Sequence, residues 1–225
     1  MLIPLLAFLL GGLTVALLYH FDVFGNSSSS PNEGSGVRAA QTRHLAPFTS
    51  VELAGANNVV IHVGERQSVV VKADDNLLNR ITTEVKSGVL VVGNTPGSFS
   101  AKSPVSVEVN VPSLNALALT GAGNILVDGI KTESLTVTLS GAGNLVGSGT
   151  ARSLDITVSG EGTGRFTQLD AGHVHALVSG HGAIFVTATK SLDASITGSG
   201  TVVYAGNPQQ VTKTVTGSGA ISGTQ

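Results

Sequence analysis

The chain has 225 residues, of which 29 are glycine, 12% are charged and 4% are aromatic, and its formal net charge is −2 at pH 7. Average globular proteins contain about 7% glycine and about 25% charged residues. The lack of a basic excess argues against nucleic acid as a partner. The absence of cysteine excludes disulfides, thiolate metal sites and cysteine nucleophiles.

Residues 1–24 are dominated by an apolar segment, and residues 1–18 carry no charged side chain. A helix of that length spans about 27 Å at about 1.5 Å per residue, close to the hydrocarbon thickness of a bilayer. The segment lacks the basic start and the small-residue cleavage site of a secretory signal. We therefore expect residues 1–24 to anchor the protein in a membrane, with a cleaved signal as the alternative. Both interpretations place the remainder outside the cytoplasm, in the cell envelope.

Residues 25–43 are expected to be a flexible tether. Their sequence is rich in Ser, Gly and Asn up to position 36 and contains few apolar residues. Such a segment buries too little apolar surface to offset the entropy of ordering it. We expect it to connect the membrane segment to a domain formed by residues 44–225.

The C-terminal half of the chain repeats a Gly-x-Gly tripeptide. Its first glycine stands at positions 121, 141, 160, 180, 198 and 217, with a spacing of 18 to 20 residues. Before each copy stands a Ser or Thr, and apolar residues alternate with other residues ahead of it. This alternation predicts a strand with one buried face. A second apolar cluster follows each tripeptide, so each unit is expected to contain two strands joined at a glycine corner.

Units of this length are too short for a helical crossover between parallel strands. The predicted fold is therefore all-β, a right-handed parallel β-helix whose coils of about 19 residues stack on one another. Residues 112–225 form its regular repeats. Residues 44–111 form irregular N-terminal coils that cap the stack, with an eroded corner at Gly55-Ala56-Asn57 and a tight turn at Lys86-Ser87-Gly88.

Two further expectations concern the stack as a whole. The Ser and Thr residues before the corners are expected to form a ladder of hydrogen-bonded hydroxyl groups. The last coil is expected to leave an exposed edge, and an exposed edge offers free backbone N–H and C=O groups to another chain. A homo-oligomer formed through this edge is one hypothesis.

Several motifs together resemble the auto-transporter adhesin head GIN domain family of bacterial envelope proteins. They are Phe48-Thr-Ser-Val51-Glu-Leu53, Asp74-Asp75-Asn76-Leu77-Leu78, Ile81-Thr-Thr-Glu84-Val85, and the corners that continue into Asn124 and Asn144. The resemblance extends from about Phe48 to Ile221. It implies a right-handed parallel β-helix in the cell envelope, and it implies no catalytic residues.

Titratable residues recur at equivalent positions of successive units. Asp155, His175 and Asp193 stand five residues before a corner, and Glu161 and His181 occupy the middle of one. With neighbouring strands about 4.8 Å apart, the first three are expected to stack on the outward face, beside His173. They fit a metal site or a general acid–base pair, but a solvated ladder of complementary charges is the interpretation we favour. We expect no cofactor and no catalytic role.

The sequence thus predicts a non-catalytic envelope protein, either an adhesion or surface-binding module or a scaffold. Its partner is expected to be an envelope carbohydrate or another protein. The alternative is an enzyme or binder that acts on envelope carbohydrate through the column of His and acidic residues.

Overall fold

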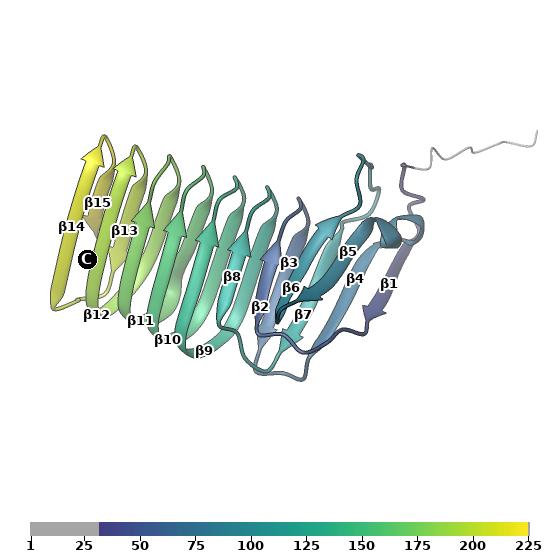
Figure 1. The fold of residues 1–225 in the computed structure, drawn as a ribbon, viewed down its shortest axis with the longest axis horizontal. Coiled ribbons are helices and arrows are strands. Elements are labelled where there is room, and N and C mark those ends of the chain that lie inside the picture. The colour runs from purple at the N-terminus through teal and green to yellow at the C-terminus, as the bar shows by residue number, and fades with distance from the viewer. Residues whose placement is uncertain (1–31, 225) are drawn as a thin grey trace, which may run out of the picture.

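The computed structural model describes residues 32–224. These residues form an elongated stack of coils, and the strands of the coils line up into two facing sheets (Figure 1). Within these residues there is no apolar helix of membrane-spanning length. The predicted anchor of residues 1–24 lies outside the described residues and stays a prediction.

The elements alternate between the two sheets for most of the chain. In chain order they are β1 (Arg38–Arg43), β2 (Ser50–Leu53), β3 (Asn58–Val63), β4 (Ser68–Asp74), the 3₁₀ helix η1 (Asp75–Arg80), β5 (Ile81–Lys86), β6 (Val89–Asn94), β7 (Ser106–Val111), β8 (Ala116–Leu119), β9 (Asn124–Leu139), β10 (Asn144–Val158), β11 (Thr163–Val178), β12 (Ala183–Gly198), β13 (Thr201–Ala205), β14 (Gln210–Gly217) and β15 (Ala220–Gly223).

We call the sheet in the order β1-β4-β7-β3-β9-β10-β11-β12-β13-β15 sheet I. Sheet II runs β5-β6-β2-β8 and continues through the second halves of β9 to β12 to β14. Strands β9 to β12 belong to both sheets because each bends from one to the other. From β2 and β3 to β15 every coil pairs in parallel with its neighbours. This arrangement confirms the predicted all-β solenoid.

Inward side chains form columns through the stack. Leu119, Leu139, Val158 and Val178 are consecutive register partners, and each is at most 1% exposed. Burying an aliphatic side chain of this size contributes about 1.5–3 kcal/mol. Because a single coil has no second layer to cover these residues, stacking is what buries them.

The glycine corners bring neighbouring backbones into direct contact. A Cβ on Gly141 would lie 1.8 Å from the carbonyl oxygen of Gly121, and one on Gly143 would lie 1.9 Å from that of Gly123. The close approach, rather than a left-handed backbone, therefore selects glycine at these two positions.

Backbone groups carry the hydrogen bonds beside the corners. The N–H of Ser140 donates to the carbonyl of Leu119 at 3.0 Å, and that of Ser159 donates to Leu139 at 2.8 Å. The predicted ladder of Ser and Thr hydroxyls is thus replaced by a ladder of backbone amides. A side-chain ladder does exist just after the corners, where Asn58, Asn124 and Asn144 are linked at 2.9 and 3.0 Å.

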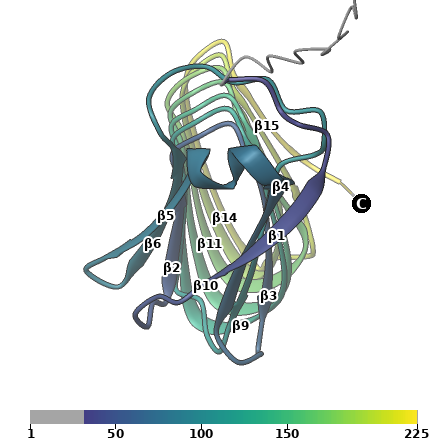
Figure 2. The same cartoon turned by 90° about the vertical axis from the view of Figure 1, so that its right-hand side faces the viewer.

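The N-terminal end of the stack is covered by a short helix and by antiparallel edge strands. Helix η1 lies across the opening (Figure 2) and buries Leu77 completely. The edge strands β1 and β5 pair antiparallel with β4 and β6. The predicted turn joins β5 to β6, with Ser87 at φ 49° and Gly88 at φ 78°. The predicted corner at Gly55 accepts the N–H of Gly123 at 3.2 Å.

Residues 32–43 of the predicted tether belong to the fold, whereas residues 25–31 lie outside the described residues. The N–H of Gly34 donates to the carbonyl of Ser100 at 2.7 Å, and residues 38–43 form β1. An edge strand is held largely by backbone hydrogen bonds, so it needs no alternation of apolar residues. The polar composition of this segment therefore concealed it.

A buried carboxyl group, Asp74, secures the cap. Its Oδ2 accepts the backbone N–H groups of Lys102 at 2.8 Å and Ser103 at 3.3 Å. A hydrogen bond from the Ser103 side chain, with these backbone bonds, lowers the pKa of Asp74, although desolvation opposes the shift. The carboxylate thereby joins the end of β4 to the loop that precedes β7.

The last coil that the structure describes, formed by β14 and β15, is less covered than the coils before it. Val211 and Val215 are 40% and 44% exposed, whereas Leu192 and Ile196, their partners one coil earlier, are at most 2% exposed. Lys213 stands in a column that is otherwise apolar, with its Nζ 4.8 Å from the centre of the Tyr204 ring. Inward-facing charges are a common means of limiting pairing at sheet edges. The homo-oligomer suggested for this edge stays a prediction.

Gly141→Ala should destabilise the protein, because the added methyl group collides with the Gly121 carbonyl. Overpacking of this kind lowers the free energy of unfolding by about 1–3 kcal/mol. Denaturant unfolding of the variant and the wild type would measure the difference. Ala142→Ser, at the exposed residue beside it, should change the free energy of unfolding by less than about 0.5 kcal/mol. Equal stability of the two variants would contradict the close approach.

Asp74→Asn should lower the melting temperature at neutral pH. A carboxyl group whose pKa is lowered by folding stabilises the folded state above its unfolded pKa, and this contribution disappears as the pH falls through the folded value. The difference between the wild type and the variant should therefore shrink below about pH 4. Thermal melts across this range test it, and a difference independent of pH would contradict an ionised Asp74.

Candidate functional site

The outward face of sheet II carries the column predicted from the sequence. Asp155 is the register partner of His175, which is in turn the partner of Asp193. The Nδ1 of His175 lies 3.4 Å from an oxygen of Asp193. The structure therefore brings these three residues together on neighbouring coils.

The remaining candidates lie around this column without closing a site. The Nδ1 of His173 lies 2.8 Å from the hydroxyl of Ser191, while Glu161 and His181 are exposed at neighbouring corners. Among residues 32–224, no group of three or more His, Asp or Glu side chains is arranged to hold a metal ion.

Exposure limits what the column can do electrostatically. The side chains of His175 and Asp193 are 51% and 58% exposed, so water screens their attraction. Exposed ion pairs contribute about 0.2–1 kcal/mol. The geometry thus fits a ladder of complementary charges, and any catalytic or metal-binding role stays a prediction.

The outward face of sheet I has a different chemistry. One row of register partners runs along it, and we call it the outer row: Val60, Leu126, Val146, Arg165, Phe185 and Val203. Leu126 is 47% exposed, and the other apolar members are half-buried. An exposed apolar surface that continues across several strands is typical of an interaction site.

Arg165 interrupts the outer row with a positive charge. Its guanidinium carbon lies 4.3 Å from the centre of the Phe185 ring on the next strand. Stacking on an aromatic ring holds a guanidinium in a defined orientation. Arg165 forms no ion pair with any residue in the described part of the chain. Its charge is therefore available to a partner.

Polar rows flank the outer row on both sides. On one side lie the linked amides of Asn58, Asn124 and Asn144, continued by Thr163. On the other side, the Nδ1 of His62 lies 3.0 Å from Asp128. The His62 side chain faces outward and is 43% exposed. The whole face thus combines an apolar strip with hydrogen-bonding groups that recur on successive coils.

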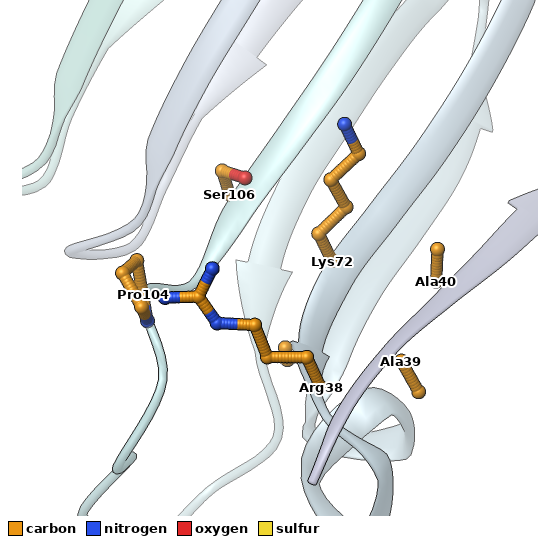
Figure 3. Close-up of a pocket in the computed structure, with 7 residues that line it drawn as sticks. Arg38, Ala39, Ala40, Lys72, Pro104 and Ser106 are labelled. Atoms are coloured by element: carbon orange, nitrogen blue, oxygen red, sulfur yellow. The ribbon is translucent and has the colours of Figure 1, made fainter. Parts of the chain in front are cut away.

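A cavity of about 330 Å³ lies at the N-terminal end of the same face, where β1, β4 and β7 meet. Its lining includes Arg38, Lys72 and Ser106, with Ala39, Ala40, Ala73 and Pro104. The Arg38 side chain extends toward Pro104 (Figure 3). Lys72 forms an ion pair with Glu108, whereas Arg38 has no ion-pair partner among residues 32–224.

Sequence reasoning missed this face. The apolar triplet at residues 125–127 and that at residues 184–186 were visible, but a run of three apolar residues does not show which member points outward. The length of each apolar run was the one available indication of an exposed apolar residue. Successive side chains of a strand point to opposite faces, so three consecutive residues cannot all be buried on one face.

Comparison with known proteins identifies the family to which this chain belongs. A family described as "Putative auto-transporter adhesin, head GIN domain" matches residues 47–208. The chain belongs to this family, which confirms the resemblance drawn from its motifs. Membership supports a non-catalytic protein of the bacterial surface or envelope. No curated protein matches the chain.

Solved structures share the fold at low identity. A putative adhesin from Bacteroides fragilis is 21% identical with a TM-score of 0.72, covering 85% of this chain and 99% of that one. A putative adhesin from Parabacteroides distasonis is 20% identical with a TM-score of 0.57, covering 85% and 99%. A putative lipid binding protein from the same species is 20% identical with a TM-score of 0.52, covering 86% and 99%.

His175→Ala should leave the fold nearly unchanged, because an exposed ion pair contributes little. We expect a loss of less than about 1 kcal/mol in the free energy of unfolding. Ile156→Ala removes a completely buried neighbour on the same sheet and should cost about 2–5 kcal/mol. Denaturant unfolding of both variants compares them, and a similar loss for His175→Ala would assign the column a larger structural role.

Proposed function

We propose that this protein is a non-catalytic adhesion module of the bacterial envelope that binds its partner through the outward face of sheet I. Residues 1–24 would hold it in the membrane. The observation that carries the proposal is the outer row, above all Leu126 at 47% exposure. Docking a partner on this row removes apolar surface from water at about 25 cal/mol per Å².

The rigidity of the stack favours binding over catalysis. Each coil is held by parallel backbone pairing to the next, so the outward groups keep fixed spacings. A surface that needs no rearrangement loses little conformational entropy when it binds. A flat, preformed face suits an extended partner.

A carbohydrate-directed role for the column on sheet II has one supporting observation, the contact between His175 and Asp193 at 3.4 Å. If that column acts on envelope carbohydrate, Asp155→Ala and His175→Ala should each abolish the activity while the protein stays folded. Retained binding to cell-wall material in both variants would favour the face of sheet I.

Leu126→Asp should weaken binding to cell-wall material at least about tenfold, because docking would have to desolvate the new carboxylate, and tenfold corresponds to about 1.4 kcal/mol. Full-length protein purified in detergent and co-sedimented with insoluble cell wall gives the measurement. Since Leu126 is exposed, folding should be little affected.

Thr138→Asp is the matched control for this experiment. Thr138 is exposed on the same strand, β9, but belongs to the half that pairs within sheet II. It adds the same charge to the opposite side of the molecule. Equal binding by the two variants, or no binding by the wild-type protein, would reject the proposed function.

A further inference from the structure

We infer that the ligand of this face is an anionic polysaccharide whose acidic groups pair with Arg165 and Arg38. The inference rests on the proposed function and names the class of its partner. It follows from where the face places positive charge, from the distance between the two arginines, and from the polar groups between them.

Arg165 is the better defined of the two contacts. It lies in the middle of the outer row, stacked on Phe185 at 4.3 Å, and no acidic residue of the described chain forms an ion pair with it. A guanidinium presents its donors in a planar fork that matches an oxyanion. An anionic group on the ligand would supply the ion-pair partner that residues 32–224 do not.

Arg38 supplies the second contact, inside the cavity at the N-terminal end of the face. Glu108 engages Lys72, and the carboxylate of Asp74 is buried and hydrogen-bonded to the Lys102–Ser103 backbone. Arg38 is therefore the exposed cation of this cavity that has no ion-pair partner. The hydroxyl of Ser106 and the small side chains of Ala39 and Ala40 leave room for one acidic unit.

The distance between the two arginines calls for an extended ligand. Strands β1 and β11 are separated by six steps in sheet I, which is about 29 Å at about 4.8 Å per step. A single sugar or a small anion cannot contact both. A polymer that contacts both gains affinity because the second contact forms within the complex.

The groups between the arginines favour a sugar polymer over an acidic peptide. Amides recur on successive strands at Asn58, Asn124 and Asn144, beside the aliphatic members of the outer row. Amides donate to and accept from hydroxyl groups, and the carbon–hydrogen faces of sugar rings pack on aliphatic side chains. A repeating surface of this kind matches a ligand that also repeats.

Binding of the full-length protein in detergent to polygalacturonate tests the inference. Neutral dextran is the uncharged comparison, and polyglutamate carries the same carboxylates without sugar rings. We expect the tightest binding to polygalacturonate, much weaker binding to galacturonic acid, and a loss of affinity as salt is added, because ions screen exposed charges.

Variants locate the contact. Arg165→Gln and Arg38→Gln should each lower the affinity for polygalacturonate about tenfold, the size expected for a lost hydrogen bond to a charged group. Arg165→Lys keeps the positive charge but loses the paired donors of the guanidinium. Its affinity for polygalacturonate should lie between those of the wild type and Arg165→Gln. Arg152→Gln is the control, because Arg152 is also exposed but pairs with Glu133 at 3.4 Å, and it should bind as the wild type does.

Three results would overturn the inference. The first is no binding to polygalacturonate, the second is binding to dextran or polyglutamate as tight as binding to polygalacturonate, and the third is unchanged affinity in both glutamine variants. If Leu126→Asp abolishes binding to cell wall while polygalacturonate does not bind, the proposed function survives and the ligand class falls. If the wild type does not bind cell wall, the proposed function itself fails, whatever the polymers show.

Discussion

The direct approach of one backbone to the next at the glycine corners is the constraint on which this structure depends. Parallel strands pair only at their normal spacing, and a Cβ at Gly141 or Gly143 would lie within 2 Å of a carbonyl oxygen of the previous coil. With glycine there, the two sheets close over columns of aliphatic residues. Hydrophobic burial then follows from a backbone geometry that only the smallest residue permits.

The first and last coils of the described stack differ in how their edges and their core residues are covered. At the N-terminal end, antiparallel strands and η1 close the core, and Asp74 joins the cap to the loop before β7. At the C-terminal end, Val211 and Val215 remain partly exposed, and Lys213 occupies a column position among apolar residues. Within residues 32–224, the first coils are thus covered, and the last coil carries a charge that makes its edge less suitable for pairing.

Because the inward columns carry the stability, the outward positions can vary in chemistry at small cost. Sheet II uses them for exposed titratable groups such as His175 and Asp193, whose interaction is screened by water. Sheet I uses them for an exposed apolar row that contains a stacked arginine without an ion-pair partner in residues 32–224. The two outward faces therefore differ in chemistry, and this difference favours binding of a partner on the face of sheet I.

The sequence by itself determined the coil, the inward columns and the corners, since period-two alternation and glycine spacing are local properties repeated six times. It also predicted the stacking of Asp155, His175 and Asp193, because equivalent positions of successive coils become neighbours. Only the tertiary structure decided that Leu126 points outward, that Arg165 rests on Phe185 and that residues 38–43 pair as β1. These features depend on partners in other coils or strands, and no local pattern records such partners.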